Sequence, residues 1–199
     1  VPTAAVDAVV AALEEKIAER VVIGDPRAEG VTMGPVVSRA QRDEVVRQVR
    51  ALQDAGGRLL LGSLEDPEVV HADGSVGLAP EGAFVAPILV GFEDATAPAV
   101  HEIEAFGPVA SVLPYASLAE AADLVDRGGG SLVTSVATNN PDVAVELMTR
   151  IAAFNGRVLF LSRENARTST GHGAPVPHLV HGGPGRAGGG EELGGIRAV

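Results

Sequence analysis

Strands alternate with helices from residue 107 to residue 162, and this alternation limits the fold more than any other feature of the sequence. Three apolar stretches are predicted to be strands, residues 107–115, 132–137 and 157–161. The helices between them begin at caps, Ser117 with Glu120 three residues later and Asn140 followed by Pro141. Strands separated by helices form βαβ units with right-handed crossovers. We therefore expect an α/β fold, with a largely parallel sheet and helices on both of its faces.

Two further helices are predicted before this region. Apolar residues recur at helical spacing from residue 6 to residue 21, opposite a charged face. A second helix is expected after Ser38, which has Gln41 three residues later, and it should end near residue 55. Apolar stripes predict the buried faces of two helices, formed by Val45, Val46, Val49 and Leu52 after Ser38 and by Val143, Leu147, Met148 and Ile151 after Asn140.

The secondary structure between residues 58 and 92 is predicted from the turn-forming and strand-breaking residues in that stretch. Residues 58–62 are expected to form a short buried strand, and the polar residues 63–80 an exposed excursion. Residues 83–92 are apolar but contain Pro87, which cannot donate a hydrogen bond to a sheet. We therefore expect this segment at the edge of a sheet rather than at its centre.

The C-terminal residues 163–199 lack hydrophobic periodicity and are predicted to form an irregular, glycine-rich arm of a single domain that spans residues 1–199. Within this arm, Gly183–Gly188 matches the pattern G-x-G-x-x-G. A dinucleotide-binding loop requires a strand before this pattern and a helix after it, with an acidic residue about 20 positions further on. The sequence does not offer that context, so we expect the glycines to let the arm pack closely against another backbone.

Composition excludes several classes of function. The 15 basic and 26 acidic residues give a net charge of −11, whereas nucleic acids and anionic membranes are bound through clustered Lys and Arg. No apolar run is long enough for a spanning helix and no signal peptide is recognisable, so a cytoplasmic location is expected. The chain has no cysteine, which excludes disulfides and thiolate metal sites. His172, His178 and His181 match no common zinc spacing, so no metal is expected.

The turn from Glu104 to Val109 is the clearest candidate for a binding site. Glu104 precedes Phe106 by two residues, and Gly107-Pro108 then lead into a predicted strand. A carboxylate in this position can accept hydrogen bonds from a ribose diol, and an aromatic ring offers a flat face to a planar ligand. The alternative is a solvated acidic loop with Phe106 packed into the core. From the residues alone this alternative is favoured, because most phenylalanines are buried.

Seven short motifs, in order and at matching spacing, resemble the C-terminal half of the aldehyde dehydrogenase family. They are Val22–Pro26, Met33–Pro35, Gln41, Phe84–Pro87, Glu104–Val109, Asn155–Gly156 and Gly188–Gly194. The run from Ser169 to Ala198 is similar to the dehydrogenase domain of the bifunctional enzymes of phenylacetate catabolism. In those enzymes a second domain opens a CoA-linked ring, and the dehydrogenase domain oxidises the resulting semialdehyde with NADP.

The resemblance implies an oxidoreductase that converts an aldehyde to a carboxylic acid with NAD or NADP, that acts on a CoA-linked semialdehyde, and that forms a homo-oligomer. It implies that Glu104 holds the nicotinamide ribose hydroxyls and that Phe106 packs near the nicotinamide. Thr170, His172 and His178 fall in the loop that lines the aldehyde pocket in relatives.

The resemblance also implies that the catalytic machinery lies outside this chain. In the family the nucleophilic Cys, the Glu base, the Asn oxyanion donor and the dinucleotide-binding domain all precede the matched region. A thiolate must add to the aldehyde before hydride can leave, and this chain has no cysteine. We therefore expect no catalytic residue in the chain and no activity for the chain alone. The alternatives are a catalytically inactive relative acting as a binding or regulatory subunit, and an unrelated ligand-binding α/β domain.

Overall fold

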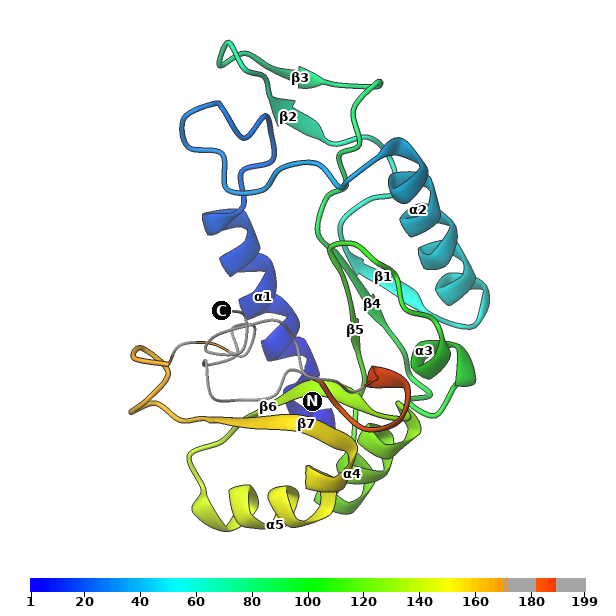
Figure 1. The fold of residues 1–199 in the computed structure, drawn as a ribbon, viewed down its shortest axis with the longest axis vertical. Helices are drawn as coiled ribbons and strands as arrows, with labels where there is room; N and C mark the ends of the chain where they lie inside the picture. Colours follow the sequence, from blue (N-terminus) through cyan, green and yellow to red (C-terminus); the bar gives the residue numbers. More distant parts are fainter. Residues whose placement is uncertain (170, 172–181, 189–199) are drawn as a thin grey trace, which may run out of the picture. The chain divides into compact units, whose positions relative to one another are not determined.

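The computed structural model describes residues 1–169, 171 and 182–188 (Figure 1). The chain divides into two compact units, Val1–Tyr115 and Ala116–Val199. The first unit contains the helices α1 (Val6–Arg20), α2 (Arg39–Asp54) and α3 (Pro98–Glu102) and the strands β1 (Arg58–Leu61), β2 (Glu68–Val70), β3 (Val76–Leu78), β4 (Ile88–Gly91) and β5 (Val109–Val112). The second unit contains α4 (Leu118–Arg127), β6 (Ser131–Ala137), α5 (Pro141–Ile151) and β7 (Asn155–Leu161). The prediction that residues 1–199 form a single domain stays a prediction.

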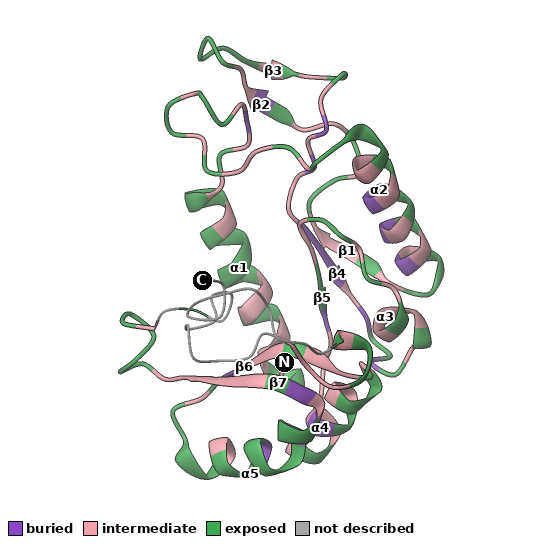
Figure 2. Ribbon diagram, in the orientation of Figure 1, coloured by how far each residue is buried: buried purple, intermediate pink, exposed green. Residues whose placement is uncertain are grey.

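A three-stranded mixed sheet with the order β1-β4-β5 is the centre of the first unit. Strand β4 runs antiparallel to β1 and parallel to β5, with Ile88 opposite Val109 and Gly91 opposite Val112. Helix α2 covers one face of this sheet and contributes three buried residues to the core (Figure 2), namely Val45, Val49 and Leu52. These side chains pack with Ile88 and Val90 of the central strand, which ties α2 to the strand that precedes the candidate turn.

The expectation that residues 83–92 lie at a sheet edge is wrong. Strand β4 occupies the central position, and its residues Ile88, Leu89 and Val90 are buried. Pro87 stands one residue before the strand begins, so its missing N–H removes no hydrogen bond from the ladder. Buried on both faces, the strand is almost entirely apolar, as central strands are.

The segment 63–80 contains a hairpin that the sequence analysis did not predict. Strands β2 and β3 pair antiparallel, and Val69 in β2 is only 1% exposed. Asp73 closes the turn between them, because its carboxylate accepts hydrogen bonds from the backbone N–H and the hydroxyl of Ser75. The dipeptide Asp73-Gly74 between two short apolar stretches is a recognised hairpin signal, so the information was present in the sequence.

The second unit confirms the predicted strand–helix–strand pattern. Strands β6 and β7 pair in parallel and are connected through α5, which forms a βαβ unit. A buried cluster joins both helices to the sheet, formed by Ala122 of α4, Val136 of β6, and Leu147 and Ile151 of α5. Met148 was expected in the inner stripe, but it is 46% exposed. The stripe is therefore narrower than predicted, because Leu147 and Ile151, four residues apart, already cover the sheet.

The described part of the C-terminal arm packs tightly against this sheet. A side-chain Cβ at Gly130 would overlap the carbonyl oxygen of Pro184, and one at Gly156 would overlap that of Gly182. The backbone N–H of Arg186 also donates to Gly129 at 2.9 Å. In the arm itself, a Cβ at Gly183 would overlap the carbonyl oxygen of Ser131, and one at Gly185 would overlap that of Gly129, which confirms the expectation that the arm glycines permit close backbone packing.

Taken together, the elements confirm an α/β fold with mixed sheets. None of the helices in the described part of the chain has both the length and the apolar character that a bilayer crossing requires.

Candidate functional site

The candidate turn connects α3 to β5. Two short hydrogen bonds shape its backbone: the N–H of Gly107 donates to Ala105 at 2.8 Å, and the N–H of Val109 donates to Gly107 at 2.8 Å. Each bond closes a γ-turn of three residues. Glu104 and Phe106 are therefore presented from a tightly folded segment, directly before the strand begins.

Helix α2 supports this turn through contacts of two of its residues. The side-chain amide of Gln41 donates a hydrogen bond of 2.5 Å to the carbonyl oxygen of Phe106. A Cβ placed on Gly107 would lie 2.6 Å from a methyl group of Val45, which is itself fully buried. The turn thus rests on the first two turns of α2 through one polar and one apolar contact.

The side chains on the outer side of the turn are accessible. Phe106 is 70% exposed, and Glu104 is exposed as well. The alternative in which Phe106 packs into the core is therefore wrong. An exposed aromatic ring and an exposed carboxylate, two residues apart, are groups that suit a ligand with a planar ring and hydroxyl groups.

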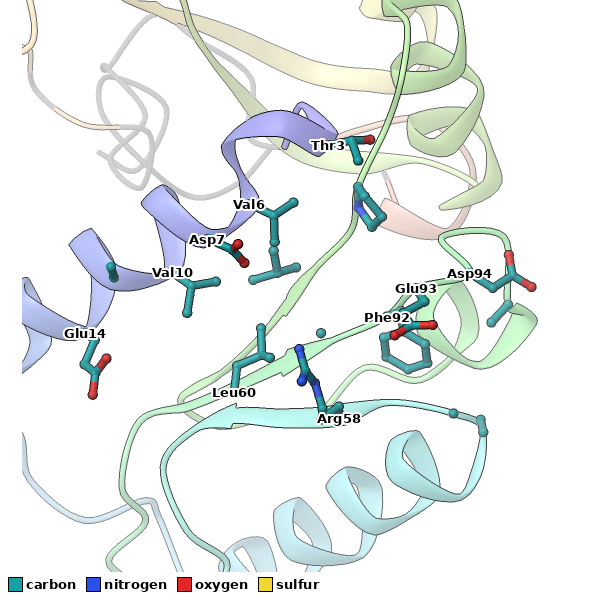
Figure 3. A pocket seen from close by; sticks show the side chains of 17 residues that line it. Thr3, Val6, Asp7, Val10, Glu14, Arg58, Leu60, Phe92, Glu93 and Asp94 are labelled. Atoms are coloured by element: carbon teal, nitrogen blue, oxygen red, sulfur yellow. The ribbon is translucent and has the colours of Figure 1, made fainter.

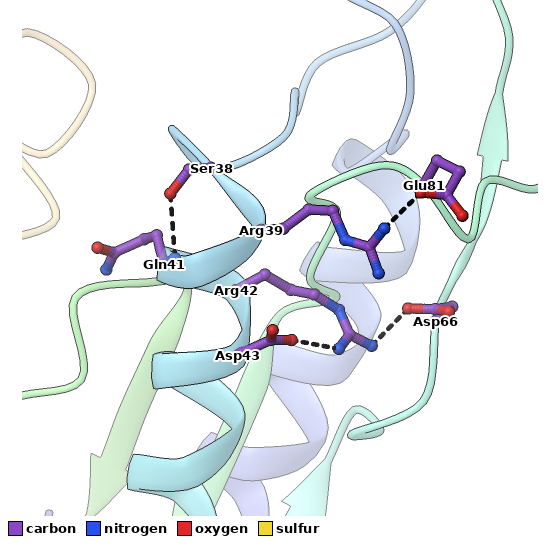
Figure 4. Close-up of polar contacts among 7 residues, drawn as sticks. All are labelled: Ser38, Arg39, Gln41, Arg42, Asp43, Asp66 and Glu81. Carbon is purple, nitrogen blue, oxygen red and sulfur yellow. Dashed lines mark hydrogen bonds and ion pairs between the residues drawn. The ribbon is translucent and has the colours of Figure 1, made fainter.

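A network of charged residues fixes the start of α2 (Figure 4). The hydroxyl of Ser38 accepts a hydrogen bond from the backbone N–H of Gln41 at 3.1 Å, as the capping pattern predicted. Arg39 pairs with Glu81 at 2.5 Å. Arg42 pairs with Asp43 at 3.0 Å and also with Asp66, and these contacts join the helix to the segment that carries the hairpin.

The pKa of Arg42 reflects this network. Partial burial lowers the pKa, but the hydrogen bonds and charges of Asp43 and Asp66 outweigh it, so the pKa of Arg42 is raised. Sequence reasoning missed these contacts because Asp66 lies 24 residues away from Arg42, and no local pattern connects the two. Their effect is to hold in place the helix on which the candidate turn rests.

A separate cavity of about 670 Å³ lies between α1 and the β1-β4-β5 sheet (Figure 3). Its walls are mainly apolar, and they include Val6 and Val10 of α1, Leu60 of β1 and Phe92 after β4. Four carboxylates and one guanidinium also line it, those of Asp7, Glu14, Glu93, Asp94 and Arg58. Val6 and Val10 are the part of the apolar stripe predicted for α1 that lines this cavity, and the helix buries none of its residues. Nothing in its lining overlaps with the candidate turn.

The three residues predicted for the aldehyde pocket, Thr170, His172 and His178, lie outside the described residues, as does His181. Within the described residues no group of three or more His, Asp or Glu side chains could hold a metal ion. In the segment Gly183–Gly188, the described residues contain one 3₁₀ turn, Gly185–Ala187. The strand and α-helix that a dinucleotide-binding loop needs are not found next to it in the described part of the chain.

Comparison with known proteins identifies the family to which the chain belongs. Residues 1–193 match the aldehyde dehydrogenase family. The chain is a member of the aldehyde dehydrogenase family. It is 45% identical to protein MaoC of Klebsiella aerogenes over 169 residues, and the matched region covers 84% of the chain and 47% of that protein. It is 38% identical to 3,4-dehydroadipyl-CoA semialdehyde dehydrogenase of Aromatoleum evansii over 163 residues, and the matched region covers 81% of the chain and 30% of that enzyme. The chain thus spans about half or less of the length of these curated relatives.

Solved aldehyde dehydrogenase structures have the same fold as this chain. Aldehyde dehydrogenase C of Pseudomonas syringae, solved with NAD⁺ and octanal, matches with a TM-score of 0.75 at 23% identity, over 99% of the chain and 36% of the other protein. Succinic semialdehyde dehydrogenase of Streptococcus pyogenes, solved with NADP⁺, matches with a TM-score of 0.73 at 22% identity, over 97% and 37%. The aldehyde dehydrogenase fold of the chain is therefore established across nearly its whole length.

Proposed function

We propose that this chain is the catalytic-domain portion of a longer NAD(P)-dependent aldehyde dehydrogenase, which oxidises a CoA-linked semialdehyde to a carboxylic acid during phenylacetate degradation. The observation that carries the proposal is the family match over residues 1–193. The substrate class is supported by the 38% identity to an enzyme named for a CoA-linked semialdehyde. A dinucleotide-binding domain elsewhere in the longer protein, a homo-oligomeric state and a cytoplasmic location are parts of the same proposal.

The Glu104–Val109 turn fits one end of a nicotinamide cofactor. The cofactor supplies the hydride acceptor when it is bound. The carboxylate of Glu104 would accept hydrogen bonds from the ribose hydroxyls, and the exposed ring of Phe106 would pack beside the nicotinamide. Gln41 would keep the backbone of the turn in place through its bond to the Phe106 carbonyl. These residues bind and orient a cofactor and do not carry out the bond-breaking steps.

The nucleophile has to come from another part of the longer protein. Aldehyde oxidation in this family begins with a thiolate that adds to the carbonyl carbon, and this chain contains no cysteine. The residues of the aldehyde pocket proposed here, Thr170, His172 and His178, would act on the substrate only once that nucleophile is present. We therefore propose that the chain alone has no dehydrogenase activity.

The absence of cysteine also favours a second candidate, in which the protein is a catalytically inactive family member that acts as a binding or regulatory subunit. One experiment separates the two. Aldehyde-dependent reduction of NAD and of NADP is measured with the 199-residue chain and with the complete protein encoded by its gene, using several simple aldehydes. We expect turnover by the complete protein only. Turnover by the chain alone would contradict the proposal, and no turnover by the complete protein would favour the inactive subunit.

A further inference from the structure

Two arginines, Arg163 and Arg167, lie in the turn after β7. Six described basic residues are in ion pairs with carboxylates, namely Lys16, Arg27, Arg39, Arg42, Arg47 and Arg150. Arg163 and Arg167 are both exposed, and no ion pair is found for either in the described part of the chain. They are separated by four positions, so two guanidinium groups are close together on a chain with a net charge of −11.

The turn that carries these arginines is held in place by Asn165. Its side-chain oxygen accepts a hydrogen bond from the backbone N–H of Ser162 at 2.8 Å, and its side-chain nitrogen donates to the carbonyl of Phe160 at 3.0 Å. The carbonyl of Asn165 accepts from the backbone N–H groups of Thr168 and Ser169. The segment 162–169 therefore has a defined backbone, although its surface is exposed.

The backbone hydrogen bonds of this turn are helix-like, and Arg163 and Arg167 are four residues apart in it. The N–H of Ala166 donates to the carbonyl of Ser162, and the N–H of Ser169 donates to that of Asn165, which makes two overlapping helix-like turns. Side chains four residues apart in such turns are neighbours. A further bond fixes the start of the turn, since the backbone N–H of Arg163 donates to the side-chain oxygen of Asn139 at 2.9 Å.

The turn adjoins a small pocket at the carboxyl ends of the parallel strands β6 and β7. The pocket has a volume of about 210 Å³, and its lining is mainly apolar, with Ser162 and Asn165 of the turn at its edge. In open α/β sheets this end of the strands is where ligands are bound. Two neighbouring guanidinium groups at this end of the strands match a phosphorylated ligand, since guanidinium groups bind phosphate through paired, charge-assisted hydrogen bonds.

We propose that Arg163 and Arg167 form an anion site that binds the phosphoryl groups of a CoA-linked substrate. The inference rests on the proposed function, because it assigns the CoA part of the proposed semialdehyde to this turn. NADP carries the same phosphoryl chemistry, but CoA is favoured because the turn continues directly into residues 170–178, which are proposed to line the aldehyde pocket. Glu164 lies between the two arginines and reduces the net charge of residues 162–169 to +1, so it weakens the attraction for an anion.

Binding of CoA to the 199-residue chain tests this site. Isothermal titration calorimetry at low ionic strength is done with CoA, NADP and inorganic phosphate as separate ligands. We expect CoA to bind, and both Arg163→Gln and Arg167→Gln to weaken its binding by roughly three- to tenfold each. Glu164→Gln should strengthen it by about two- to threefold, because a nearby repelling charge is removed. Arg127→Gln, which removes the same charge from an exposed position on α4, is the matched control and should leave binding unchanged.

The outcomes separate the possible ligands. Equal binding of CoA to the wild-type chain and to all four variants would overturn the site. An effect of Arg127→Gln as large as those of Arg163→Gln and Arg167→Gln would overturn it too, because it would show attraction by net charge alone. Tighter binding of NADP than of CoA through the same two arginines would overturn the assignment to the substrate. Binding of inorganic phosphate as tight as that of CoA would overturn it too. The dehydrogenase proposal is tested with simple aldehydes that carry no phosphate, so it would survive any of these results.

Discussion

The side-chain amide of Gln41 donates a hydrogen bond to the backbone carbonyl of Phe106, a residue 65 positions further along the chain. The backbone N–H of Gln41 is held at the same time by the hydroxyl of Ser38. One residue therefore completes the cap of α2 and supports the turn that presents Glu104. The position of the proposed cofactor-binding turn depends on how α2 begins.

Removal of this amide should affect cofactor binding more than folding. We expect Gln41→Ala in the complete enzyme to raise the KM for the nicotinamide cofactor several-fold, because the turn loses its support. The cost in the free energy of unfolding should be about 1 kcal/mol, typical of one hydrogen bond. Steady-state kinetics and urea denaturation measure the two effects. Gln48→Ala is the control, since Gln48 is on the same helix and its side-chain amide donates to Glu44; an equal change in KM there would contradict the specific role of Gln41.

The contact between Gly107 and Val45 leaves no space for a side chain. We expect Gly107→Ala to destabilise the chain by about 1–3 kcal/mol, because the added methyl group must displace a fully buried valine. Thermal and urea denaturation of the 199-residue chain give this value. Gly77→Ala is the control, because a methyl group there meets its nearest neighbour, His71, at an ordinary 3.6 Å.

The same contact can be tested by a double-mutant cycle. Combined with Val45→Ala, the Gly107→Ala substitution should cost less than it does in the wild-type background, because the smaller residue at position 45 makes room for the new methyl group. Strictly additive effects would show that the two residues are not in contact.

A low pKa at Asp25 predicts a stability change in acid. The side chain and then the backbone N–H of Arg27 donate hydrogen bonds to the carboxylate, and they lower the pKa of Asp25 to about 2. A lowered pKa means that the ionised form is favoured in the folded state, so this contribution is complete above pH about 4 and is lost as the pH falls through about 2. Wild-type and Asp25→Asn chains should therefore converge in stability over that range. NMR titration checks the cause, since Arg27→Gln should return the pKa of Asp25 towards its ordinary value.

Asn155 is the one buried polar residue named in the described core, at 7% exposure. Its side chain accepts a hydrogen bond from the hydroxyl of Thr134 and donates one of 2.7 Å to the carbonyl of Ile151. Asn155→Ala leaves both groups without a partner, so we expect a loss of about 1–3 kcal/mol in the free energy of unfolding. Asn140→Ala, which removes an exposed helix cap, is expected to cost about 1 kcal/mol. Chemical denaturation of both variants should show Asn155 as the more costly, and the reverse order would contradict this account.

Local signals in the sequence predicted the elements that depend on local contacts. The hydroxyl of Ser117 and the side chain of Asn140 cap α4 and α5 as expected, because both bonds lie within a few residues. The place of β4 in its sheet could not be read from Pro87, since the effect of a proline depends on where the pairing begins. The sequence placed Gln41 in a capping pattern, but the partner of its side chain is set by tertiary packing. For the same reason no pattern could show whether Phe106 is exposed.

The glycine contacts of the arm also determine which substitutions the second unit can accept. At Gly130 and Gly156 the nearest atoms are backbone carbonyls of residues 184 and 182, and these cannot rotate away as a flexible side chain would. A library that varies both positions should therefore return glycine almost alone among folded clones, even though neither residue takes part in the proposed chemistry. Invariance at these two positions in any set of relatives would measure packing between backbones, and it should not be taken as a sign of a binding site.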